Sequence, residues 1–244
     1  GNSLELIQIG KQDIVFAGGS EEIHWAMTAM FDAMTALSSK YNDTPETASR
    51  AYDKNRDGFV IAGGGGVLVL EEYEHAKARG AKIYAELVGG GLSADAHHMT
   101  APHPEGIGAK KVMLNCLKDA NIKPEEVDII NMHGTSTPLG DLAETNAVIS
   151  VFGEHAYKMN LNSTKSMTGH LLGAAGAIES IASIMAIQNN VVPPTINHKI
   201  HDDQLDHEIN FTLGKPQKRE INIALSNTFG FGGHNACVIF KKIN

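Results

Sequence analysis

Short apolar runs and longer stretches with helical spacing alternate along this chain. Strands are predicted where β-branched and other apolar residues follow one another, over residues 13–17, 58–61, 67–70, 83–88, 127–132, 160–163, 221–227 and 236–241. Helices are predicted over residues 71–79, 108–120, 139–152 and 174–188. This alternation is typical of an α/β protein whose sheet is covered by helices.

The first seventy residues carry two further expectations. The spacing of Leu4 and Ile7 is helical, so the chain is expected to begin inside a helix, although Asn2 or Ser3 could cap a natural start. Two buried strands are expected to flank the four glycines at 63–66.

Composition narrows the class of protein. The chain has 244 residues and a mass of 26.1 kDa, with 42% hydrophobic and 20% charged residues, the mix of a folded protein of one or two domains. Its net charge of −8 provides no broad positive field, so nucleic acid is not expected as a partner. No run reaches the ~18 apolar residues of a membrane span, so we expect no membrane partner and a soluble cytoplasmic protein.

The cysteines exclude further classes. Only Cys116 and Cys237 occur, too few for a disulfide framework and too far apart for a CxxC site. Cys116 falls within a predicted helix and Cys237 within an apolar strand, where a thiol stays protonated. Neither is expected to be a nucleophile.

Three segments place polar or glycine residues directly after a predicted strand: 133–138, 163–170 and 226–235. Ligands and catalytic groups gather at strand ends in open α/β sheets, so we expect the three segments to form one site. His133 could present its imidazole to a ligand or be a structural histidine. Lys165 and His170 are equally compatible with a site and with a close-packed helix entry.

Other motifs give weaker signals. The glycine-rich segment 229–233 could direct backbone N–H groups at an oxyanion, or form a tight turn. It is not a phosphate loop, and the glycines at 63–66 lack dinucleotide-binding spacing. His97, His98 and His103 are expected to be solvated loop residues, because their spacing lacks a helical ligand pair and a thiolate. No metal and no organic cofactor is therefore predicted.

Taken together, the motifs resemble one family. HGTSTPLGD at 133–141, TKSMTGHLLGAAG at 164–176 and SNTFGFGGHN at 226–235 are similar to three signatures of the elongating β-ketoacyl-acyl-carrier-protein synthases of type I/II. The resemblance extends over nearly the whole chain. It implies a thiolase-like fold in layers αβαβα, with residues 1–80 as the remainder of an amino-terminal half and 81–244 as a complete carboxyl-terminal half.

The resemblance also implies an activity. The family are acyltransferases that elongate fatty acids by a decarboxylating Claisen condensation of malonyl carrier protein with an acyl-enzyme thioester. They use no cofactor, bind acyl carrier protein and usually form homodimers.

By motif position, the resemblance implies roles for nine residues. His133 and His170 would stabilise the enolate, Lys165 would orient the second histidine, and Glu144 would be the partner of that lysine. Phe231 would complete an oxyanion hole and gate the acyl tunnel. Substrate-binding roles fall to Thr135, Thr137, Phe229 and Gly232. In some relatives, the positions of Asn131, Glu179, Ser226 and Asn227 hold a structural cation. His234 departs from the family motif, which commonly has Thr there.

One family residue has no match in this sequence. The resemblance places the nucleophilic cysteine about two helical turns before Gly1, so the chain is expected to be active only together with a segment that bears it. Two alternatives stay open: a non-catalytic, carrier-binding partner subunit and an inert fragment. Retention of both histidines and Lys165 favours the enzyme.

Overall fold

A five-stranded mixed sheet forms the centre of the computed structural model, which describes residues 1–243. Its order is β3 (Glu86–Ala94), β9 (His234–Lys241), β8 (Ile223–Gly230), β4 (Ile129–Asn131) and β5 (Asn160–Asn162). β4 pairs in parallel with both β5 and β8, and β9 is antiparallel to both of its neighbours. Consequently, β4, β5 and β8 end at the same edge of the sheet.

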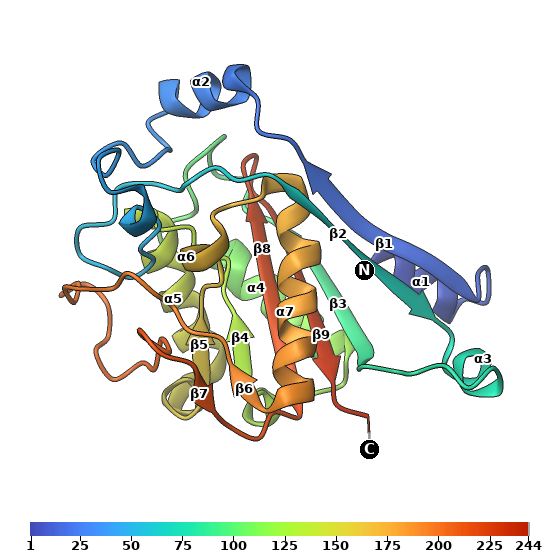
Figure 1. Cartoon of the computed structure of the whole chain (residues 1–244). Coiled ribbons are helices and arrows are strands. Elements are labelled where there is room, and N and C mark those ends of the chain that lie inside the picture. The colour runs from blue at the N-terminus through green and yellow to red at the C-terminus, as the bar shows by residue number, and fades with distance from the viewer. Residues whose placement is uncertain (244) are drawn as a thin grey trace.

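Helices cover both faces of this sheet (Figure 1). α4 (Ile107–Asp119) and α5 (Pro138–Phe152) lie on one face, where Ile130, Leu161 and Leu225 join the main core. α7 (Ala175–Asn189) lies on the other face, against Ile129, Ala224 and Phe240. The strands are therefore apolar on both faces, as covered parallel strands should be.

A two-stranded antiparallel ribbon packs against the far side of α7 (Figure 1). It consists of β1 (Ile14–Glu21) and β2 (Gly64–Glu71). Three more helices belong to this part of the chain: α1 (Asn2–Gln8), α2 (Trp25–Ala33) and α3 (Tyr73–Ala78). A link over residues 79–85, in which exposed and half-buried residues alternate, leads from α3 to β3, so the ribbon and the sheet are joined by one short connection (Figure 1).

The remaining elements are short. They are α6 (Lys165–Thr168), the strands β6 (Val191–Val192) and β7 (Gln217–Lys218), and the 3₁₀ turns η1 (Pro45–Thr47), η2 (Pro124–Glu126), η3 (Gly153–Tyr157) and η4 (Leu172–Ala174). No helix within residues 1–243 is long and apolar enough to cross a bilayer.

The prediction for the glycine run is wrong. Residues 58–61 form no strand and contribute only isolated bridges, Leu37 to Phe59 and Ile61 to His170. The glycines at 64–66 do not separate two strands but are the first three residues of β2, in register with residues 19–21 of β1. Close packing explains two of them, because a Cβ on Gly64 would lie 2.8 Å from Leu171 Cδ2 and a Cβ on Gly66 would lie 3.0 Å from Ile178 Cδ1.

The expected burial of the strand at 13–17 is also only half correct. β1 alternates between exposed and half-buried residues, and Phe16 keeps 74% of its surface exposed. Val67 and Val69 of β2 lie on the same face and are 61% and 55% exposed. One face of the ribbon packs on α7 and the other is uncovered by residues 1–243.

Candidate active site

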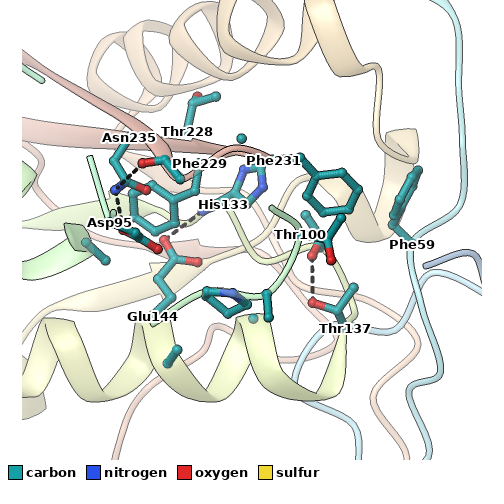
Figure 2. Close-up of a pocket in the computed structure, with 18 of the residues that line it drawn as sticks. Phe59, Asp95, Thr100, His133, Thr137, Glu144, Thr228, Phe229, Phe231 and Asn235 are labelled. Atoms are coloured by element: carbon teal, nitrogen blue, oxygen red, sulfur yellow. Dashed lines mark hydrogen bonds between the residues drawn. The ribbon is translucent and has the colours of Figure 1, made fainter. Parts of the chain in front are cut away.

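The three strand ends come together around one cavity. Its volume is about 330 Å³, and its wall includes His133 after β4, His170 before η4 and the turn after β8. Figure 2 shows His133 beside Phe229, and the centroids of these two rings are 5.5 Å apart. Residues from all three polar segments therefore line one cavity.

The two predicted histidines face each other edge to face, with ring centroids 5.3 Å apart. The backbone N–H of Leu172 donates to Nδ1 of His170 at 3.2 Å, so Nδ1 is the acceptor and the ring proton lies on Nε2. Nδ1 of His133 is buried without a partner among residues 1–243. In both rings Nε2 is therefore the nitrogen that remains open to the cavity.

Burial and a nearby cation keep both imidazoles neutral. Desolvation lowers the pKa of His170 to about 3, and the charge of Lys165 adds to this effect. Desolvation, Lys165 and His170 together lower the pKa of His133 well below its ordinary value. At neutral pH, each ring is an uncharged hydrogen-bond donor.

The partner of Lys165 is not Glu144. The lysine is 1% exposed and forms an ion pair with Glu179 of α7, on the face of the sheet opposite α5. Burial raises the pKa of Glu179, and the charge of Lys165 opposes this rise. Glu179 was not predicted as the partner of Lys165. The two residues lie in different helices, α7 and α6, and the sequence spacing does not indicate that these helices meet in the folded chain.

Glu144 instead holds the backbone that carries His133. Its two oxygens accept the backbone N–H groups of His133 at 2.8 Å and Gly134 at 2.9 Å, and Asn227 Nδ2 donates to Oε1 at 3.1 Å. Burial raises the pKa of Glu144 to about 7, although these donors favour the charged form. Glu144 is 2% exposed and fixes the turn after β4.

The same turn presents the predicted hydroxyl residues. Thr135 and Thr137 line the cavity, and their Oγ1 atoms are 3.0 Å apart. α5 begins directly after them with Pro138 at its first position, where a missing N–H costs no helical hydrogen bond. Asp141 accepts the backbone N–H of Ser136 at 3.1 Å and so closes the turn.

Of the three residues predicted to contribute to the site from the glycine-rich segment at 229–233, two line the cavity. Phe229 and Phe231 line the cavity, and the backbone N–H of Phe231 has no acceptor among residues 1–243. Gly232 does not line the cavity, because its N–H donates to the carbonyl oxygen of Met99 at 2.6 Å. Within this turn, Phe231 is the residue whose N–H is free to bind a ligand oxygen.

Several cavity residues were missed. Phe59 packs against His170 with ring centroids 5.2 Å apart, and Phe31 of α2 packs against both Phe59 and Phe231. These aromatic rings come from α2 and an irregular segment, where the sequence has no periodicity or motif to mark them.

A second missed feature is a pair of polar cavity residues. Asn235 Nδ2 donates to Asp95 Oδ1 at 2.7 Å (Figure 2). Asp95 also accepts the backbone N–H of His103 at 3.2 Å, so this pair fixes the loop at 95–106 against the turn after β8.

Neither cysteine belongs to the cavity. Cys116 and Cys237 are buried in the core between α4 and β9, and Cys116 Sγ lies 3.4 Å from the carbonyl oxygen of Cys237. Burial raises the pKa of Cys237 well above its ordinary value. Both thiols lack the exposure that a nucleophile needs.

The cation positions that the resemblance implies fit only in part. Asn131 is in register with Ser226, and Asn131 Nδ2 is 3.5 Å from the carbonyl oxygen of Glu179. Oε2 of Glu179 is buried and has no partner among residues 1–243. The side chain of Asn227 instead contacts Glu144. Glu179 already forms an ion pair with Lys165, so its charge is balanced without a cation, and Asn131 and Ser226 would be the remaining ligands.

Two neutral imidazoles open to one largely apolar cavity are suited to stabilise an oxyanion with uncharged hydrogen-bond donors. Comparison with known proteins gives the family. The β-ketoacyl synthase N-terminal domain matches residues 2–76, and the β-ketoacyl synthase C-terminal domain matches residues 84–199. The chain belongs to the β-ketoacyl synthase family.

Curated relatives match along the full chain. 3-oxoacyl-acyl-carrier-protein synthase 1 of Haemophilus influenzae is 51% identical over 245 residues, and the Escherichia coli enzyme of the same name is 50% identical over 244 residues. Each match covers 100% of this chain and 58% of the relative. The chain thus spans less than two thirds of their length.

Solved structures agree on the fold. A type II PKS acyl carrier protein in complex with its ketosynthase bound to the hexaketide matches with a TM-score of 0.97 at 40% identity, covering 100% of this chain and 60% of that one. A β-ketoacyl synthase from Burkholderia phymatum matches with a TM-score of 0.94 at 39% identity, covering 100% of this chain and 58% of that one. These matches confirm the α/β, thiolase-like prediction.

Proposed function

We propose that the protein carrying this sequence is an acyltransferase that elongates fatty acids by decarboxylating Claisen condensation. The supporting observation is the pair of Nε2 atoms, of His133 and His170, that open into the same cavity. A malonyl thioester oxygen placed between them would accept two hydrogen bonds from uncharged donors. The bonds would strengthen as negative charge develops on that oxygen, which is what catalysis requires.

We propose a role for residues of this chain in each step. The carbon–carbon bond to the carboxylate breaks and CO₂ leaves, while His133 and His170 hold the enolate oxygen. The enolate carbon then attacks the carbonyl carbon of the acyl thioester, and the backbone N–H of Phe231 binds the oxygen of that carbonyl. The thiolate of the acyl-enzyme leaves, and the product is a 3-oxoacyl thioester on the carrier.

Residues 1–243 do not supply the thiol that would bear the acyl group, because Cys116 and Cys237 are both buried away from the cavity. We assign this role to a cysteine outside the given sequence, as the resemblance implies. The division into units 1–80 and 81–244, a homodimer, a cytoplasmic location and acyl carrier protein as partner belong to the same proposal.

The test is decarboxylation of malonyl carrier protein by the protein that carries this sequence. His133→Ala and His170→Ala should each lower the rate at least about 100-fold, because each removes an oxyanion donor. His207→Ala is the matched control, since His207 is exposed and outside the cavity. Equal rates in all four proteins would refute the proposed roles and favour the non-catalytic, carrier-binding subunit.

A further inference from the structure

The turn between His170 and α7 has an unusual backbone. Leu172 has a φ of 45°, in the left-handed region that favours glycine. Its N–H is the group that donates to Nδ1 of His170. A strained conformation of this kind persists only where the surroundings hold it. The ring proton on Nε2 of His170 thus depends on whatever holds this turn.

One side chain from a distant part of the sequence reaches this turn. Oε2 of Glu21, the last residue of β1, accepts the backbone N–H of Gly173 at 3.0 Å. The backbone N–H of Gly173 is therefore bound by Glu21, while the N–H of Leu172, one residue earlier, donates to His170. A Cβ on Gly173 would lie 3.2 Å from the same carboxylate oxygen, so the contact is close.

The backbone of His170 is held separately. Its N–H donates to the carbonyl oxygen of Val60 at 2.7 Å, and its carbonyl oxygen accepts the N–H of Ala62 at 3.0 Å. These bonds fix the position of His170 but not the tautomer of its ring. Apart from His170 itself, Glu21 is the only side chain within residues 1–243 that binds a backbone N–H of the turn at 171–174.

We propose that Glu21 is a positioning residue: it holds the turn at 171–174 so that Leu172 donates to Nδ1 and His170 keeps its proton on Nε2. The inference rests on the proposed function for its catalytic consequence, but the tautomer itself can be measured without turnover. Glu21 lies outside the cavity wall and acts only through Gly173 and Leu172.

Two substitutions separate the hydrogen bond from the rest of the side chain. Glu21→Met keeps the length and removes the acceptor, whereas Glu21→Gln keeps an acceptor oxygen. In the protein that carries this sequence, Glu21→Met should lower kcat for malonyl decarboxylation about 10-fold with KM unchanged, because misplacing a reacting group costs rate. Glu21→Gln should restore most of kcat. Glu22→Met is the matched control, because Glu22 is exposed and makes no side-chain hydrogen bond within residues 1–243.

The tautomer is measured by ¹⁵N NMR of histidine-labelled protein, with His170→Gln used to assign the signal. The parent and Glu21→Gln should show an unprotonated Nδ1 and a protonated Nε2, and Glu21→Met should show a mixture of tautomers. An unchanged tautomer in Glu21→Met, or a Gln variant as impaired as the Met variant, would overturn the proposal. If the histidine variants decarboxylate normally, the proposed function fails, while the spectra still decide the role of Glu21.

Discussion

At the scale of single residues, Glu144 shows how burial and hydrogen bonding compete in this site. Its carboxyl group accepts three hydrogen bonds, yet its pKa rises from 4.5 to about 7, because removal from water costs the charged form more than these donors return. Between these two pH values the folded chain holds a proton on Glu144 that the unfolded chain has lost. The contribution of Glu144 to stability therefore decreases as pH rises.

This difference predicts a pH dependence for Glu144→Gln, which removes the ionisable group and keeps an acceptor. Between pH 4.5 and pH 7 the free energy of unfolding of the parent should fall relative to the variant, by up to about 3 kcal/mol. Urea titrations at several pH values measure both curves, and Asp141 and the histidines contribute equally to each. Parallel curves would contradict the raised pKa of Glu144.

At the scale of elements, the sequence predicts a helix best where the hydrophobic periodicity agrees with the proline and glycine residues that mark its ends. The helix expected at 139–152 is observed at 138–152, because Pro138 marks its start and Gly153 follows its end. The glycines of β2 could not be placed in the same way, because Gly64 packs against Leu171 and Gly66 against α7, and both contacts exist only in the folded chain. The two histidines could be singled out as candidates, since His133 follows the strand β4 and His170 lies in the long motif at 164–176. Phe31 and Glu179 could not, because only the folded chain brings their helices to the site.

The crossing of β1 over the turn at 171–174 predicts a sharp difference between two glycines. Gly19→Ala would place a Cβ 2.0 Å from the carbonyl oxygen of Gly173, so the turn or the ribbon must shift, at a cost of about 1–3 kcal/mol. Gly65→Ala meets no atom closer than 3.7 Å and should change stability by less than about 0.5 kcal/mol. Chemical denaturation of both variants checks this, and equal effects would contradict the close crossing.

At the scale of the whole molecule, the ribbon leaves an apolar face uncovered by residues 1–243. Ile14, Phe16, Val67 and Val69 lie together on it, opposite the face that packs on α7. Large exposed apolar patches mark contact surfaces or promote association. The fold is thus well packed around the five-stranded sheet and open at the ribbon.

Residues 1–244 produced on their own should therefore self-associate through this face. Phe16→Glu should reduce the association and the binding of a hydrophobic dye, because it places a charge at the centre of the patch. Gln12→Glu adds the same charge just before β1 and serves as the control. Sedimentation at micromolar concentration measures the result, and identical profiles for the two variants would contradict the role of the patch.

The link at 79–85 has a consequence for protein engineering. The ribbon contacts the rest of the chain through α7 and through Glu21, not through this link, so a break in the peptide chain there would leave those contacts intact. Glu21 and His170 would then belong to two separate polypeptides. The fragment before the break also buries Ala51 and Tyr52 in the main core, so the two fragments would reassemble through these contacts, and weakening the contacts would make the pair a split reporter of binding between two fused test proteins.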